Sequence, residues 1–200
     1  YNSATIIDKH HKLQPSYDKM ELLLFGEAVP LANELPWLRR MFQRSGGLIP
    51  GNSIRALSVS RDDGPALRIA VMNCYEDTLP GLGRRLFGQV QPNLLVNITN
   101  DAWFVGTEEP TLHLRLAAMR SIELRRDTVR SVNLGVAGWI DASGRVRARS
   151  SSDAPSFAVV EPSLRSTPAT VYARYGETPM LLFFVLSGVA LGWRQQRRAA

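Results

Sequence analysis

The chain has 200 residues and a mass of 22.2 kDa, a length that fits one domain with a sizeable core or part of a larger one. Its 24 basic and 18 acidic residues give a formal net charge of +6. Half of that excess comes from Arg194, Arg197 and Arg198, and the remainder is too mild, and too scattered among other residues, for nucleic acid to be expected as a partner. A single cysteine, Cys74, excludes an internal disulfide framework and a zinc site built from paired thiolates.

The first 177 residues read as strands mixed with helices. The chain begins at Tyr1 without a secretory signal and runs directly into a strand-like segment, so we expect further residues of the same protein upstream. Short β-branched or apolar runs predict strands, several of them separated by turn signals such as Gly81-Leu82-Gly83. These strands are expected over residues 4–8, 54–59, 67–72, 94–99, 129–134, 136–141 and 157–160. The mixture implies an α/β domain.

One helix stands out, from about Glu108 to Arg126, with Pro110 near its first turn. Its apolar face is predicted from residues at helical spacing, broadened by their neighbours: Leu112, Leu116, Met119 and Ile122, then Leu114, Ala117, Ala118 and Leu124. Beyond the last strands, Ser150–Pro155 reads as a polar loop and Glu161–Glu177 as an irregular connection.

The one long apolar run is Met180 to Trp193, with 14 residues and no charge. As a helix it would be about 21 Å long, against about 30 Å for the hydrocarbon core of a bilayer, and this length favours a buried core helix. The run has no polar face, however, and a basic tail follows it, which favours a membrane span. We therefore expect a transmembrane helix over 178–193 and a basic cytoplasmic tail over 194–200.

Functional groups gather where predicted strands end. Cys74 follows the strand at 67–72, and a cysteine at such a strand-end turn can act as a nucleophile. The alternative is an inert buried cysteine, the commoner fate of a lone one. Lys19 and Glu27 flank an apolar stretch and, taken alone, also read as solvated surface charges.

Two further blocks complete the pattern. A strand runs into the polar and aromatic turn Thr99-Asn100-Asp101-Ala102-Trp103-Phe104. The predicted helix carries His113, Arg120 and Glu123, of which the last two are spaced to pair on one helix face. The histidines show no metal-ligand spacing with acidic residues, so neither a metal nor another cofactor is expected.

Taken in order, these blocks resemble the apolipoprotein N-acyltransferases, membrane enzymes of the nitrilase (carbon–nitrogen hydrolase) superfamily. The blocks are Tyr17…Lys19…Phe25-Gly26-Glu27…Pro30, Cys74-Tyr75-Glu76, the turn at 99–104, and His113…Arg120…Glu123…Arg130…Asn133. The resemblance covers nearly the whole chain and includes Val171-Tyr172-Ala173-Arg174 and the closing apolar run. Asn73, Val105 and Asp127 depart from the usual pattern of the family but remove no catalytic group.

The resemblance implies an α/β fold of the nitrilase type, an αββα sandwich, with residues 1–177 as the C-terminal part of that domain. It also implies a Glu-Lys-Cys triad with a second glutamate eight residues after the lysine. Cys74 matches the nucleophile, Lys19 the lysine and Glu27 the second glutamate. The general-base glutamate has no candidate in this chain and is expected upstream, so the fragment alone is expected to be inactive.

The implied reaction moves a fatty acyl chain from a phospholipid to the N-terminal amine of a diacylglyceryl-modified lipoprotein. Cys74 would carry the acyl group as a thioester, Lys19 and the Tyr75 N–H would support the oxyanion, and Glu76 would shape the acceptor site. Phe25, Trp103 and Phe104 are candidates for contact with acyl chains. The implied location is the bacterial inner membrane, with the catalytic domain on the periplasmic face.

Two alternatives remain open from the residues. A soluble amidohydrolase of the nitrilase type would use the same triad with water as the second nucleophile. A catalytically silent, membrane-tethered binding domain would retain the fold without the general base.

Overall fold

The computed structural model describes residues 1–43, 45, 47–62, 64–150 and 156–199, and it shows an α/β fold built around one six-stranded sheet. The strands follow one another across the sheet in chain order. The three central strands are parallel and the outer ones antiparallel. Their bounds are β3 (Leu57–Val59), β4 (Leu67–Asn73), β5 (Leu94–Asn100), β6 (Thr128–Asn133), β7 (Gly138–Ile140) and β8 (Val146–Arg149).

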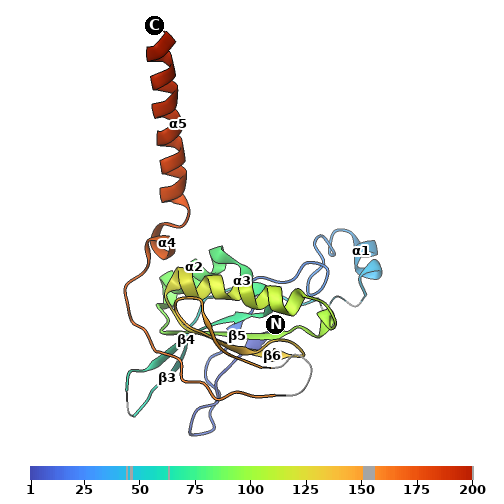
Figure 1. Ribbon diagram of the computed structural model, residues 1–200. Coiled ribbons are helices and arrows are strands. Elements are labelled where there is room, and N and C mark those ends of the chain that lie inside the picture. The colour runs from blue at the N-terminus through green and yellow to red at the C-terminus, as the bar shows by residue number, and fades with distance from the viewer. Residues whose placement is uncertain (44, 46, 63, 151–155, 200) are drawn as a thin grey trace.

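Two helices connect the parallel strands and cover one face of the sheet (Figure 1). They are α2 (Pro80–Val90) and α3 (Glu109–Leu124), and each follows a short 3-10 turn at a strand end, η1 (Cys74–Thr78) and η2 (Ala102–Phe104). Right-handed crossovers of this kind place both turns at the carboxyl edge of the sheet.

The remaining elements lie outside this layer. A two-stranded sheet pairs β1 (Ser3–Ala4) with β2 (Tyr17–Asp18), and α1 (Pro36–Met41) lies on an arm to one side. At the other end, α4 (Val171–Tyr175) packs near α2, and α5 (Thr178–Ala199) projects away from the body as a single helix (Figure 1).

The main core lies between the sheet and its two helices. Side chains alternate along the strands, so Ala70, Met72 and Leu95 point toward the helices and are fully buried. They pack with Leu86 of α2 and Leu124 of α3. On the opposite face Ile98 is 44% exposed, so the described residues supply one helix layer and one sheet layer of the four-layer sandwich expected.

Most predicted strands are confirmed, with differences at the ends of the domain. No strand forms over residues 157–160, where Phe157 and Val159 are exposed, because nothing pairs with this segment. Neither β8 nor the helices α1 and α2 were predicted. The run Gly81-Leu82-Gly83 lies inside α2 instead of forming a turn. There Gly83 allows α2 to approach α3, since a Cβ at this position would lie 3.1 Å from Cδ of Arg120. Of the predicted loop Ser150–Pro155, residues 151–155 lie outside the described residues.

The predicted helix is confirmed as α3, but only part of its predicted apolar face is right: Leu114, Ala117 and Leu124 are buried, whereas the four residues at the centre of the prediction are not. Leu112, Leu116, Met119 and Ile122 are all 41–52% exposed. The buried face carries Leu114, Ala117 and Leu124 together with His113, Arg120 and Ser121. His113 and Arg120 can be buried because each has a carboxylate partner. The spacing of apolar residues in the sequence does not reveal such pairs.

The C-terminal apolar run forms a helix, but the expected transmembrane span over 178–193 is not supported. Among the described residues, no helix combines the length and the apolar character that crossing a bilayer requires. The uncharged run has 14 residues, and α5 then continues through Arg194 and Arg197. Its large apolar side chains are exposed along its whole length, so it is not the buried core helix of the alternative interpretation either.

Two leucines of α3 test which face of the helix carries stability. Leu124→Ala removes a side chain that is fully buried, and we expect it to destabilise the protein by about 2–5 kcal/mol. Leu116→Ala, on the same helix but 51% exposed, serves as the matched control and is expected to change stability by less than about 1 kcal/mol. Thermal unfolding of the full-length protein measures both, and equal effects would contradict this assignment of faces.

Candidate active site

Cys74 lies where β4 leaves the core. Its backbone is in the left-handed region, with φ 56°, and its side chain is only partly buried, so the thiol stands in the turn above the edge of the sheet. Asn97 of β5 holds this turn from the neighbouring strand: its Nδ2 donates to the carbonyls of Met72 at 3.0 Å and of Cys74 at 2.8 Å. A strained turn fixed in this way presents a nucleophile at the carboxyl ends of the parallel strands.

Glu76 is fully buried two residues further on and joins two distant segments. One carboxylate oxygen accepts the N–H groups of Met20 at 2.7 Å and Glu21 at 2.9 Å. The other accepts the Tyr17 hydroxyl at 3.0 Å and the Asn73 N–H at 2.7 Å. Burial raises the pKa of Glu76, and the backbone N–H groups act in the opposite direction. Its geometry is therefore that of a clamp between residues 17–21 and the Cys74 turn, and no acceptor-shaping role is visible.

The clamp fixes Lys19, which is fully buried. Its Nζ lies 2.6 Å from Oε2 of Glu27, and the remaining ammonium hydrogens have no acceptor among the described residues. Its backbone is held on both sides, by the Asn2 carbonyl at 2.8 Å and the Gly51 N–H at 2.7 Å. The structure thus brings together the lysine and the glutamate predicted eight residues apart.

Glu27 is in turn oriented by its own donors. Oε2 accepts the Leu23 N–H at 2.9 Å, and Oε1 accepts Nδ2 of Asn2 at 3.3 Å. Burial acts to raise the pKa of Glu27, but the Leu23 N–H and Lys19 outweigh it, so its pKa lies below the ordinary value. Asn73, one of the departures noted in the sequence, donates to Oδ1 of Asn2 at 2.9 Å and so joins this network to the Cys74 strand.

Tyr75 links Lys19 to the nucleophile. The Lys19 ammonium lies 5.1 Å from the centroid of the Tyr75 ring, and the Tyr75 hydroxyl donates to the carbonyl of Leu22 at 3.0 Å. Since Tyr75 directly follows Cys74, these contacts place the buried cation beside the turn that carries the thiol. A cation in this position suits an anion that forms on an acyl oxygen.

The three aromatic candidates are exposed side chains. Phe25 is 49% exposed, has a positive φ of 62°, and packs on Phe42 with ring centroids 4.8 Å apart. Trp103 is 78% exposed and Phe104 41% exposed, on η2 at the end of the strand next to β4. Trp103 and Phe104 thus lie at the carboxyl edge of the sheet and Phe25 lies beside the segment at 40–43, and none of the three has a described contact with Cys74.

A buried charge network, which the sequence reasoning missed, lies behind the Cys74 turn. His113 of α3 places Nε2 2.8 Å from Asp77 of η1 and Nδ1 3.2 Å from Asp101. Arg130 of β6 donates to the other oxygen of Asp77 and lies 3.9 Å from Asp101. The sequence contained these residues, but only the parallel pairing of β4, β5 and β6 brings them together.

The same network bears on metal binding. Oxygens of Asp101 and Glu109 and a ring nitrogen of His113 lie within 4.8 Å of one another, a grouping with the ligand types of a metal site. The i, i+4 spacing of Glu109 and His113 was the available sequence signal. Cations already lie beside these carboxylates, however: Arg130 is 3.9 Å from Asp101, and His113 is 3.2 Å from Asp101 and 3.8 Å from Glu109. Burial lowers the pKa of His113, but the bonds to Asp101 and Asp77 outweigh it and raise that pKa to about 9.

Comparison with known proteins identifies the family to which the chain is similar. Residues 1–169 match the carbon-nitrogen hydrolase family. Among curated proteins, apolipoprotein N-acyltransferases are similar: that of Bdellovibrio bacteriovorus is 31% identical over 96% of this chain and 35% of the relative, and that of Bradyrhizobium diazoefficiens 35% identical over 94% and 34%. The chain therefore spans about a third of the length of these relatives.

Solved structures support the fold. A carbon-nitrogen hydrolase from Helicobacter pylori G27 superposes with a TM-score of 0.57 at 13% identity, covering 76% of this chain and 53% of that one. A mutant amidase from Nesterenkonia sp. AN1, with acrylamide added at its active site cysteine, gives a TM-score of 0.53 at 16% identity, covering 91% and 62%. At this identity the likeness shows the fold alone.

Glu76→Gln tests the clamp. The amide replaces one accepting oxygen by an NH2 group that faces N–H or O–H donors, and leaving a buried donor unsatisfied costs about 1–3 kcal/mol. We expect a lower unfolding temperature together with loss of Cys74 reactivity toward iodoacetamide. Glu21→Gln is the matched control, because Glu21 forms only a half-exposed ion pair with Arg85, which contributes little. The clamp is refuted if both variants behave alike.

His113 predicts a pH dependence of stability. Its folded-state pKa of about 9 lies above the ordinary 6.5, so its stabilising contribution is complete below about pH 6.5 and is lost as the pH rises through about 9. Between these limits we expect the unfolding temperature of the full-length protein to fall. The fall should be weaker in His113→Gln, whereas the exposed His10→Gln should retain it. An unchanged profile in His113→Gln would contradict the assignment of this fall to His113.

Proposed function

This chain belongs to the carbon–nitrogen hydrolase family, and on that premise we propose that it carries the nucleophile of an apolipoprotein N-acyltransferase. The donor is a phospholipid and the acceptor is the N-terminal amine of a diacylglyceryl-modified lipoprotein. The observation that carries the proposal is the joint placement of Cys74, Lys19 and Glu27 by the Glu76 clamp. The similar curated proteins, all named apolipoprotein N-acyltransferases, support this choice within the family.

In the first half-reaction the Cys74 thiolate attacks the carbonyl carbon of a fatty acyl ester. A C–S bond forms, the carbonyl oxygen takes negative charge, and the buried ammonium of Lys19 stabilises it. Collapse of this intermediate breaks the ester C–O bond and leaves the acyl thioester. The lysophospholipid oxygen takes up the proton that came from the thiol.

In the second half-reaction the acceptor amine attacks the thioester carbon. A C–N bond forms, the C–S bond breaks, and the proton released by the amine returns to the Cys74 sulfur. We assign the proton transfers to a general-base glutamate outside this chain, as the family pattern implies, so the fragment alone is expected to be inactive.

The remaining candidates fit the same scheme in secondary roles. We propose that Glu27 holds Lys19 in place, since the two side chains are paired at 2.6 Å. Phe25, Trp103 and Phe104 expose apolar surface that we propose contacts acyl chains, with Trp103 and Phe104 at the carboxyl edge of the sheet. Because both substrates carry lipid, we place the reaction at the bacterial inner membrane, on its periplasmic face.

Intact-mass analysis of the full-length protein in phospholipid micelles, without acceptor, tests the first half-reaction. We expect a fatty acyl adduct that hydroxylamine removes and that is absent in Cys74→Ala. Lys19→Met should slow adduct formation about 10²–10³-fold, the usual cost of removing one oxyanion donor. Lys12→Met, at an exposed lysine on the same segment, is the control and should react like the wild type.

The outcomes separate the alternatives. When a diacylglyceryl-modified peptide is then added to the adduct, loss of the acyl group to water with none on the peptide favours an amidohydrolase. No adduct in folded protein favours a catalytically silent domain. Either result overturns the acyltransferase proposal.

A further inference from the structure

A second candidate site lies at the amino ends of the parallel strands, at the opposite edge of the sheet from Cys74. It is a cavity of about 260 Å³. Arg68 enters it from the start of β4, whereas Cys74 follows the end of the same strand, so the length of β4, about 20 Å, separates the two. The lining residues are Arg68, Phe87, Gln91, Arg126, Ser166, Thr167, Pro168, Ala169 and Arg174. This cavity has no part in the proposed reaction.

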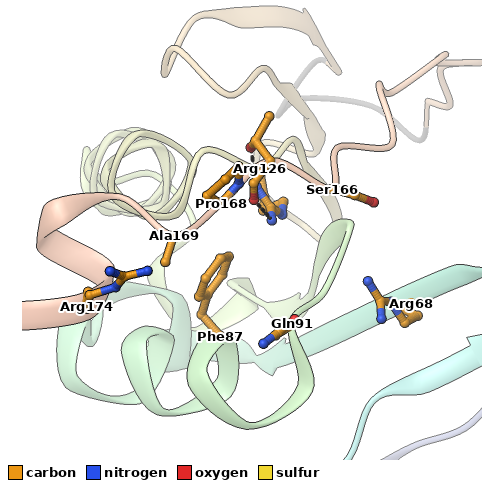
Figure 2. Close-up of a pocket in the computed structure, with 9 residues that line it drawn as sticks. Arg68, Phe87, Gln91, Arg126, Ser166, Pro168, Ala169 and Arg174 are labelled. Atoms are coloured by element: carbon orange, nitrogen blue, oxygen red, sulfur yellow. Dashed lines mark hydrogen bonds between the residues drawn. The ribbon is translucent and has the colours of Figure 1, made fainter.

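The cavity is lined by three arginines and no acidic residue. Arg126 forms its inner wall, is only 2% exposed, and lies 4.9 Å from the centroid of the Phe87 ring. Figure 2 shows Arg126 and Phe87 in the middle, with Arg68 and Arg174 on opposite sides of them. A cavity of this composition repels cations and attracts anions.

Neutral groups satisfy the hydrogen bonds of Arg126 without cancelling its charge. Its donors reach the carbonyls of Pro92 at 2.6 Å and Thr167 at 2.8 Å, and the Thr167 hydroxyl at 2.9 Å. The adjacent Asp127 turns away, because its carboxylate accepts from Trp139 and Ser163. Burial and the neighbouring charges of Arg68 and Arg165 lower the pKa of Arg126, as expected for a buried cation without a counter-ion.

The other two arginines are available to a ligand. Arg68 and Arg174 are exposed, and neither guanidinium has a hydrogen bond or ion pair among the described residues. The Ser166 hydroxyl also has no described partner, and the Thr167 hydroxyl accepts from Arg126 and keeps its own proton for donation. Two free guanidinium forks and two hydroxyls therefore face one small volume.

We propose that this cavity, lined by Arg68, Arg126 and Arg174, binds a phosphate group. Planar guanidinium groups match phosphate oxygens in pairs, and a doubly charged anion fits three cations better than a carboxylate does. The volume lies below the usual range of about 300–1,000 Å³ for drug-sized ligands, which suits a phosphate group and not a larger anion. Free phosphate and the headgroup of a phospholipid both present paired phosphate oxygens to guanidinium groups, and the headgroup phosphodiester carries one negative charge instead of two.

Calorimetric titration of the full-length protein with inorganic phosphate tests the site. We expect saturable binding of phosphate by the wild type. The double variant R68Q/R174Q should bind at least tenfold more weakly, which corresponds to the loss of about one charge-assisted contact. Both positions are exposed, so the fold should persist, as the unfolding temperature will verify. Arg126 is not substituted, because its bonds to backbone carbonyls hold the loop at 166–169. Arg115→Gln, at an exposed arginine of α3 outside the cavity, is the control for loss of a surface charge elsewhere.

A second arm identifies the source of the phosphate group. Mixed micelles of dihexanoylphosphatidylglycerol are added to protein holding radiolabelled phosphate. If the lipid displaces the label, the site binds the headgroup of a phospholipid. If the label is retained, the site binds free phosphate. The proposal is overturned if the wild type binds no phosphate, or if R115Q weakens binding as much as R68Q/R174Q. Acylation of Cys74 measured in parallel should be unchanged in R68Q/R174Q, which keeps this result separate from the fate of the proposed reaction.

Discussion

The buried carboxylate of Glu76 is the interaction on which the geometry of the candidate active site depends. It accepts four hydrogen bonds, two from the segment that carries Lys19, one from Tyr17 and one from the strand that ends at Cys74. Residues about 55 positions apart in the chain are thereby held at one point. A buried carboxylate is stable only when its oxygens are satisfied, so the clamp requires both segments to be in place. The position of Lys19 relative to the nucleophile thus follows from the folding of the whole domain.

Two sets of charges with different functions occupy the two edges of the same sheet. At the carboxyl edge, the charges of Asp77 and Asp101 are compensated by those of His113 and Arg130, and this network lies behind the turn that carries Cys74. At the amino edge, Arg126 has only neutral acceptors and like-charged neighbours. The difference between a compensated and an uncompensated buried charge is the physical basis for assigning support to the first and ligand binding to the second.

The family motifs in the sequence predicted the residues of the candidate site more accurately than the apolar patterns predicted which side chains are buried. The spacing of Lys19 and Glu27 and the position of Cys74 after a strand were readable, and the structure pairs the first two directly. Glu76, expected near the acceptor site because it lies two residues from Cys74, is fully buried, and its hydrogen bonds to residues 17–21 could not be read from the sequence. The apolar face of α3 was placed correctly only in part, because its buried side also includes His113 and Arg120. His113 pairs with a carboxylate of another element, and Arg120 pairs with Glu123 of α3 itself.

The sequence by itself determined the α/β class, most strands of the sheet and the long helix after β5, and it singled out Cys74, Lys19 and Glu27 as candidates for the site. These follow from local properties: β-branched runs, helical spacing and a family pattern of short motifs. Only the tertiary structure decided which charges are paired, which face of α3 is buried, and that three arginines from β4, α4 and the end of α3 line one cavity. Such contacts join residues from distant parts of the chain, and their energies depend on burial and on the partner, neither of which a local pattern contains.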